Sequence, residues 1–112
     1  MRRMPNCEQA IVDIRKVEDY CLSSVHPRGR HKARVFHRAL GIDRSQGSWL
    51  RSTLLDGVRS REAVELDADA FGSRWQVDVP VMRDGKTAVV RTLWIIRAGE
   101  SAPRFVTAWV LR

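Results

Sequence analysis

"RWQVDVPVMRDGKTAVVRTLWII", residues 74–96, carries the strongest structural signal in the sequence. Up to Met82, apolar and polar residues alternate, as they do in a strand with one buried face. The apolar face holds Trp75, Val77, Val79 and Val81, and the polar face holds Arg74, Gln76 and Asp78. Asp84-Gly85 is typical of a two-residue hairpin turn. After the turn, residues 87–96 are apolar on both faces, which predicts a central strand.

Two shorter strand signals flank this hairpin. "AVEL" (63–66) precedes it, and "RFVTAWVL" (104–111) follows the loop "AGESAP" (98–103). In the last strand we expect Thr107 to share a face with Phe105 and Trp109, because side chains alternate along an extended chain. The connections are short, so the four strands are predicted to form an antiparallel meander.

Up to about residue 61 the apolar spacing is helical. A first helix is predicted over Asp13–Ser24, and His26-Pro27 ends it because a residue before proline is disfavoured in the helical conformation. A second helix is predicted over Arg30–Leu40, with Gly41 in the left-handed position that follows a helix. A third helix, capped by Asp43 or Ser45, runs to about Ser60 and buries one stripe of side chains. That stripe holds Trp49, Leu50, Leu54 and Val58.

Helices followed by strands predict an α+β fold, with two to three helices packed on one face of a four-stranded antiparallel sheet. The 112 residues are expected to form a single domain, 1–112, in which residues 1–12 are an ordered or a flexible extension. The hydrophobic fraction of 44% is high enough for a real core and excludes wholesale disorder.

The chain is strongly basic, with 20 Lys and Arg against 13 Asp and Glu, a formal net charge of +7 and a pI of about 10.7. Such a charge attracts polyanions, of which nucleic acid is the commonest. Cys7 and Cys21 make neither a disulfide framework nor a zinc site; a single structural disulfide stays open as an alternative, and two reduced thiols are expected. No cofactor or metal-ligand spacing is present, no apolar run approaches a membrane span, and "MRRMP" lacks the apolar stretch of a signal peptide. We expect the domain to act in the cytoplasm, without a membrane partner.

"HPRGRHKARVF" (His26–Phe36) is the most basic stretch. On a helical wheel Arg30 and Arg34 lie on the polar side, where a solvated face and a row of phosphate contacts are both open interpretations. Lys32 falls inside the apolar arc instead, between Val35 and Phe36. An inward ammonium must reach outward to water, find a carboxylate such as Asp78 or Glu65, or wait for an anion.

Several segments together resemble a family of small bacterial domains of unknown function. They are "VEDYCLSSVHPRGRHKARVFHRALGI", "FGSRWQVDVPV", "DGKTAVVRTLWII" and "APRFVTAWVL", and the resemblance covers about residues 17–111. Its most specific parts are the His-Pro-x-Gly-x-x-Lys-Ala spacing and the terminal Val-Thr. Members occur at the C-terminal tips of large secreted polymorphic toxins, including filamentous-haemagglutinin-like proteins, and as free-standing chains. The resemblance departs at "SSV" before His26, where relatives often carry Asn-Pro, and in the density of arginine.

The resemblance implies a toxin context, and the predicted order of elements is similar to the barnase–EndoU–colicin–RelE group of metal-independent ribonucleases. Carried over by position, its motif residues are His26, Lys32, Arg91, Thr92, Trp94 and Thr107. Arg91 and Thr92 are neighbours in one strand, so they face opposite sides and only one can face the core. Trp94 or Trp109 could stack a base if it lies on an open sheet face.

The leading hypothesis is therefore a metal-independent endoribonuclease of the toxin type. In it His26 serves as general base or acid, Lys32 and Arg91 hold the phosphate, and Thr107 or Thr92 adds a hydrogen bond. Substrate contacts are expected from Arg28, Arg30, Arg34, Thr92, Trp94 and Trp109. The alternatives are a non-catalytic nucleic-acid-binding module and a protein-interaction module of a toxin–antitoxin pair. RNA and an acidic antitoxin or immunity protein are the expected partners.

Overall fold

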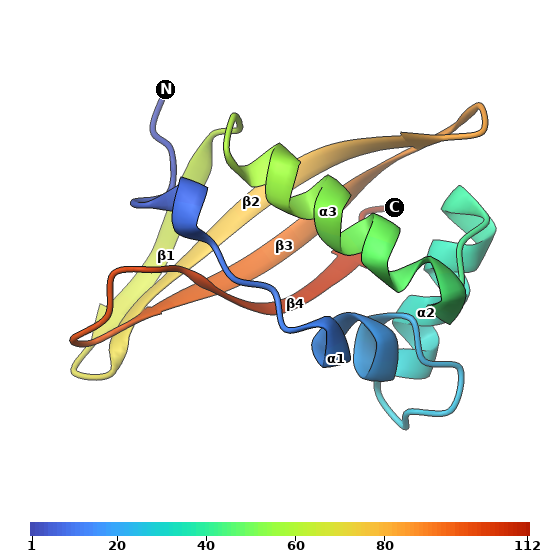
Figure 1. The fold of residues 1–112 in the computed structure, drawn as a ribbon, viewed down its shortest axis with the longest axis horizontal. Coiled ribbons are helices and arrows are strands. Elements are labelled where there is room, and N and C mark those ends of the chain that lie inside the picture. Colours follow the sequence, from blue (N-terminus) through green and yellow to red (C-terminus); the bar gives the residue numbers. More distant parts are fainter.

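The computed structural model describes residues 1–112 and has an α+β fold (Figure 1). A four-stranded antiparallel sheet has the order β1-β2-β3-β4 and is the predicted meander. The strands are β1 (Ala63–Asp69), β2 (Gly72–Arg83), β3 (Lys86–Arg97) and β4 (Arg104–Val110). The helices are α1 (Ile14–Lys16), α2 (Gly29–Leu40) and α3 (Gly47–Val58), with a π turn at Val17–Cys21 and short 3₁₀ turns at Cys7–Gln9 and Arg44–Gln46.

The predicted hairpin is the centre of the sheet. Arg83 pairs with Lys86 across Asp84 and Gly85, and both turn residues have positive φ, 48° and 79°. Positive φ at both positions matches the right-handed twist of the flanking strands, which is why Asp-Gly is favoured there. The strands β2 and β3 then pair along their whole length, from Gly72 to Arg97. β3 is a central strand, as predicted.

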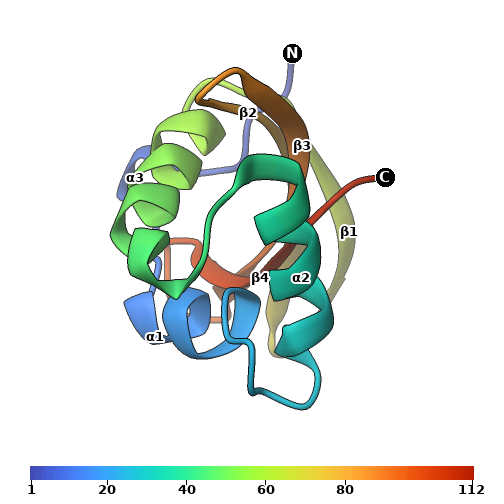
Figure 2. The ribbon, with the colours of Figure 1, turned by 90° about the vertical axis from the view of Figure 1, so that its right-hand side faces the viewer.

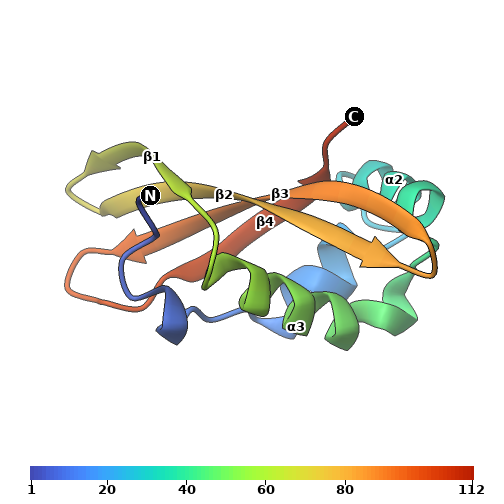
Figure 3. The same ribbon diagram turned by 90° about the horizontal axis from the view of Figure 1, so that it is seen from above.

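One face of the sheet is the core. The apolar residues that alternate along β2 are all at most 3% exposed, and they pack against α3 in a single hydrophobic cluster. They are Trp75, Val77, Val79 and Val81. Figures 2 and 3 show α3 lying across this face, while α2 packs at the free edge formed by β4, where it contacts β3 and β4. The opposite face is only half covered, so its polar alternation in β2 (Arg74, Gln76 and Asp78) points away from the core.

The helix predictions hold with two corrections. α2 begins one residue early, and Gly41 takes the left-handed conformation (φ 67°) as predicted. Asp43 caps the Arg44–Gln46 turn through a capping box. The single helix predicted over Asp13–Ser24 is wrong, because after one turn the backbone widens into a π turn that ends when Leu22 N donates to Val17 O.

Trp49 is the second correction. It was expected in the buried stripe of α3 with Leu50, Leu54 and Val58, which are indeed fully buried. Trp49 is only half-buried, and the Arg83 guanidinium lies 4.7 Å from its ring centroid. It sits at the margin of the helix, where an aromatic ring can pack on the core and still meet a cation.

The N-terminal residues are ordered against the sheet. Met4, Cys7 and Val12 are buried in the same core cluster. Ile11 forms a parallel bridge to Arg104, at the start of β4. Residues 1–12 are therefore part of the packed structure. No helix is both long and apolar enough to cross a bilayer.

Candidate functional site

Lys32 lies in the first turn of α2 and its side chain crosses to β4. The ammonium donates hydrogen bonds to the Tyr20 hydroxyl at 2.8 Å and to the Thr107 hydroxyl at 3.1 Å. It also lies 4.6 Å from the ring centroid of Tyr20 and 5.5 Å from that of Trp109. The prediction that Lys32 points inward is confirmed, and its neighbours are hydroxyls and aromatic rings.

Neither carboxylate considered as a partner for Lys32 contacts it. Glu65 pairs with Arg2 at 3.5 Å, and Asp78 pairs with Arg91 at 2.9 Å. The half-buried ammonium thus has no neutralising charge within the chain. A partly desolvated cation without a counter-charge is costly, and a bound anion would offset that cost.

The hydrogen bonds at Lys32 leave donors free. An ammonium has three N–H groups, of which the two hydroxyls take two. Tyr20 and Thr107 accept these bonds, and the Tyr20 O–H has no partner within the chain and remains to donate. Cys21 Sγ lies 3.9 Å from Thr107 Oγ1, and burial raises the pKa of this thiol, so it stays neutral. The cluster of Tyr20, Lys32 and Thr107, called the Lys32 cluster below, combines one cation with free donors and suits an anion.

A bulge in β4 places Thr107 in this cluster. Leu93 pairs with Thr107, but the next residue, Trp94, pairs with Phe105, so Val106 is an extra residue on β4. The bulge turns Phe105 into the core while Thr107 and Trp109 face the other side. The expectation that Thr107 shares a face with Phe105 is therefore wrong, whereas the shared face with Trp109 is confirmed.

The start of α2 is fixed by the His-Pro-x-Gly segment. His26 Nδ1 accepts hydrogen bonds from the backbone N–H groups of Arg28 and Gly29, both at 3.0 Å. Gly29 packs directly on the backbone of Tyr20, and a Cβ at this position would overlap the Tyr20 carbonyl oxygen. The glycine is thus required by a close approach of two backbones, and this contact sets the distance between Tyr20 and Lys32.

His26 lies beside the cluster and has a structural task. Its ring meets the Tyr20 ring edge-on, with centroids 4.8 Å apart. Its Nδ1 lone pair is occupied by the N–H groups of Arg28 and Gly29, so a general-base role at this nitrogen would require both hydrogen bonds to be released.

Arg91 shares the half-covered sheet face with the cluster but does not touch Lys32. It lies opposite Trp109 in the strand register. Its guanidinium is held bidentately by Asp78 at 2.9 and 3.0 Å, and this pairing raises the pKa of Arg91. Arg91 is therefore already occupied.

Thr92 and Trp94 face the core, on the opposite side of β3 from Arg91. Both are 0% exposed. Thr92 Oγ1 donates to Val77 O at 2.6 Å and accepts from Trp94 Nε1 at 2.7 Å. In this structure they form an internal polar pair and have no access to a substrate, so the candidate site leaves them out.

The other cations around α2 are exposed and form no ion pair. Arg28, Arg30 and Arg34 project into solvent, as does Arg38 one turn further on. Arg30 and Arg34 also line a cavity of about 320 Å³ on the side of α2 away from Lys32. These residues give α2 exposed positive charge that no ion pair compensates.

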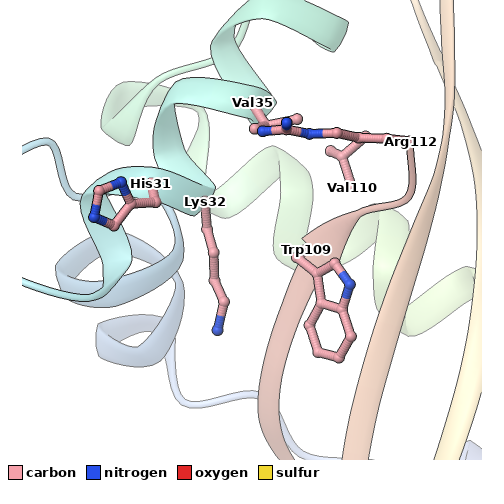
Figure 4. A pocket seen from close by; sticks show the side chains of 6 residues that line it. All are labelled: His31, Lys32, Val35, Trp109, Val110 and Arg112. Atoms are coloured by element: carbon pink, nitrogen blue, oxygen red, sulfur yellow. The ribbon is translucent and has the colours of Figure 1, made fainter.

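A second cavity, of about 440 Å³, opens between α2 and the end of β4. It is lined by His31, Lys32, Val35, Trp109, Val110 and Arg112. Figure 4 shows Lys32 and Trp109 extending into the same space, with Arg112 above them and His31 projecting to the other side of α2. No three His, Cys, Asp or Glu side chains come together as a metal-binding group, and both cysteines are free thiols.

A family model described as "Domain of unknown function (DUF6883)" matches residues 3–112, nearly the whole chain. The chain belongs to the DUF6883 family. Comparisons with functionally curated proteins and with solved structures found no match. The function of this DUF6883 domain must therefore be inferred from its own geometry.

Tyr20 is the site residue that sequence reasoning missed. The chain has one tyrosine, and it stands in the "DYC" segment at twelve positions before Lys32. That isolated tyrosine within the quoted motif was an available signal. Its role depends on the π turn, which periodicity alone did not indicate.

Proposed function

We propose that this DUF6883 domain is a toxin-type ribonuclease that binds the RNA backbone at the Lys32 cluster and cleaves it without a metal ion. The observation that carries the proposal is the half-buried Lys32 ammonium, which two hydroxyls hold at 2.8 and 3.1 Å and no carboxylate neutralises. A phosphate oxygen would take its third N–H. The toxin context comes from the resemblance in the His-Pro-x-Gly-x-x-Lys-Ala motif.

The chemistry requires one displacement at phosphorus. The 2′-oxygen of the RNA forms a bond to phosphorus, and the bond from phosphorus to the 5′-oxygen breaks. The 2′-hydroxyl gives its proton to solvent water, and the 5′-oxygen gains one from a protein hydroxyl, which water then reprotonates. Lys32 would stabilise the charge that grows on the non-bridging oxygens, because a fixed cation in a partly dry site needs no rearrangement during the reaction.

Tyr20 replaces His26 as the proposed proton-transfer residue. Its O–H is free, and it would stand beside the same phosphate as Lys32. It is placed to give the leaving 5′-oxygen its proton. His26 and Gly29 are positioning residues in this proposal, since they fix the start of α2 and the backbone of Tyr20.

The test is incubation of the purified domain with total RNA in the presence of a chelator. We compare the wild type with Lys32→Met and Tyr20→Phe, and use Lys86→Met, an exposed lysine at the β2–β3 turn, as the matched control. Lys32→Met should slow cleavage roughly a hundredfold, which corresponds to about 3 kcal/mol of transition-state stabilisation. Its free energy of unfolding should change by less than about 1 kcal/mol, because the lost ammonium has no counter-charge.

Activity and stability are measured on the same preparations. A Lys32→Met variant that melts several degrees lower and cleaves RNA normally would make Lys32 a structural anchor and contradict the proposal. An intact wild type that never cleaves RNA, with or without chelator, would contradict the catalytic part alone.

A second candidate function is non-catalytic RNA binding. It is favoured because two side chains that were expected to be catalytic are already hydrogen-bonded within the chain. His26 Nδ1 accepts from the backbone at the start of α2, and Arg91 donates to Asp78. In this case Lys32→Met weakens RNA binding but no products appear for any variant. For either function of the toxin type we propose an acidic antitoxin or immunity protein as inhibitor, covering the free cations of α2.

A further inference from the structure

We propose that the cavity between α2 and β4 holds one unpaired nucleobase, stacked on Trp109, while the phosphate of the same nucleotide lies at Lys32. The domain would then select single-stranded RNA over duplex. The proposal rests on the proposed function in one respect, because both use Lys32 as the phosphate ligand.

Trp109 differs from the other three tryptophans. Trp75 and Trp94 are at most 2% exposed and donate their indole N–H groups to Ser73 and Thr92. The Trp49 ring is covered by the Arg83 guanidinium. Trp109 is half-buried, lines an open cavity and makes no indole hydrogen bond within the chain. It therefore offers both a stacking surface and a free donor.

The cavity has the size and chemistry of a nucleotide site. Its volume of about 440 Å³ lies within the usual range for small-ligand pockets, roughly 300–1,000 Å³. Val35 and Trp109 supply apolar wall, and Lys32 and Arg112 supply positive charge. A base stacks on an aromatic ring irrespective of its identity, since every base has a π face.

The cation and the ring are neighbours, so one nucleotide could contact both of them. Lys32 Nζ lies 5.5 Å from the Trp109 ring centroid. One ribose separates the phosphate and the base of a nucleotide, so neighbouring subsites for the two are what a nucleotide requires. The β4 bulge creates this arrangement, because it puts Thr107 and Trp109 on the same side as Lys32.

A paired base could not enter this cavity. In duplex RNA each base is stacked on both sides and bonded to its partner, so a side chain reaches its face only after unpairing and unstacking. A base in a single strand or a loop has already lost these contacts. Selectivity for single strands follows because only an unpaired base exposes a free face to Trp109 between α2 and the end of β4.

The experiment titrates the intact protein with ribose 5-phosphate, adenosine 5′-monophosphate and uridine 5′-monophosphate, using wild type, Trp109→Leu, Trp109→Phe and Lys32→Met. In the wild type the nucleotides should bind roughly tenfold more tightly than ribose 5-phosphate. Trp109→Leu should remove this difference and leave ribose 5-phosphate binding unchanged. Trp109→Phe, which keeps an aromatic face, should retain most of the difference and shows that loss is not a folding defect. Lys32→Met should weaken all three ligands.

A second comparison uses one short RNA, free and annealed to its complement. The single strand should bind more tightly in the wild type, and Trp109→Leu should reduce that preference. Two results would overturn the base site while leaving the phosphate site of the proposed function intact. One is that the nucleotides bind no more tightly than ribose 5-phosphate. The other is that the difference in affinity between them persists in Trp109→Leu. If neither ribose 5-phosphate nor either nucleotide binds, both the base site and the Lys32 phosphate site are contradicted.

Discussion

Residues 20–42 and the rest of the chain treat positive charge in opposite ways. Between Tyr20 and Ile42 the sequence has no Asp or Glu, and none of its lysines or arginines is in an ion pair. Elsewhere many arginines are matched with carboxylates. These are Arg2, Arg15, Arg44, Arg59, Arg74, Arg83, Arg91 and Arg104. About half of the positive charges in the larger region are thus paired within the fold, whereas in residues 20–42 none is paired, and all remain for an external anion.

The acid-free segment must then be held by other means. Its positive charges repel one another, and because it contains no Asp or Glu, no ion pair within the segment can hold it in place. Its frame is instead a set of close contacts, in which Gly29 packs on the Tyr20 backbone and His26 accepts two backbone N–H groups. Ser23 Oγ adds bonds from the N–H groups of Val25 and His26. This frame can present cations without needing carboxylates nearby.

The largest expected effect is on RNA affinity. It is seen by removing three positive charges from residues 20–42 in one variant and from the rest of the chain in another. A triple variant Arg30→Gln, Arg34→Gln, Arg38→Gln should lose roughly a hundredfold in affinity for single-stranded RNA at low salt, because each lost phosphate contact removes released counterions. Its salt dependence should also flatten by about 0.7 per contact in log affinity against log salt.

The matched control is Arg15→Gln, Arg44→Gln, Arg104→Gln, which has the same net charge but draws on paired arginines. Fluorescence anisotropy at several salt concentrations measures both variants. Equal losses would mean that only net charge matters, and the distinction between the regions would collapse.

The next effect concerns the frame. Gly29→Ala puts a methyl group against the Tyr20 carbonyl oxygen, so the two backbones must separate. We expect a loss of about 1–3 kcal/mol in the free energy of unfolding, as for other overpacked sites. Urea unfolding measures it, with Arg30→Ala, an exposed position in the same helix, as the control. A Gly29→Ala variant as stable as the control would mean that the close approach is not needed.

Sequence reasoning reached the elements that periodicity controls. The β2–β3 hairpin and the inward direction of Lys32 both follow from spacing of a few residues, and both are confirmed. Periodicity could not reach the two partners of Lys32, because they stand 12 and 75 positions away; Thr107 entered the expected site only through the family resemblance, and Tyr20 was missed. One depends on the π turn and the other on the bulge at Val106, and each shifts the side-chain alternation by a local irregularity that a regular pattern does not encode.

Acid should weaken the fold through carboxylates that lie outside residues 20–42. Hydrogen bonds to Arg15 lower the pKa of Asp13 to about 2, a backbone bond from Phe71 lowers that of Asp69, and Arg104 lowers that of Glu100. A carboxyl group with a lower pKa in the folded state stabilises the fold above its ordinary pKa. That contribution disappears as the pH falls from about 4 towards 2.

The measurement is the urea midpoint at pH 6 and at pH 2.5. The variant Asp13→Asn, Asp69→Asn, Glu100→Gln should lose less stability on acidification than the wild type, by a modest amount because these groups are exposed and screened. Residues 20–42 contribute no carboxylate to this loss. An unchanged acid dependence in the triple variant would show that the surface pairs do not stabilise the fold.

The smallest effect comes from freeing one paired arginine. Asp78→Asn removes the bidentate partner of Arg91, which lies opposite Trp109 on the same sheet face as Lys32. The pair is about one-third exposed and screened by solvent, so the stability of the fold should change little. RNA affinity should rise a few-fold, since one guanidinium becomes available to a phosphate. Glu100→Gln is the matched control, because it frees Arg104, at the start of β4 and remote from Trp109, and removes the same charge. A rise for Asp78→Asn alone would extend the RNA path from Lys32 across Trp109 towards Arg91. Equal rises for both variants would trace the gain to net charge, and no rise for Asp78→Asn would confine the path to residues 20–42 and the end of β4.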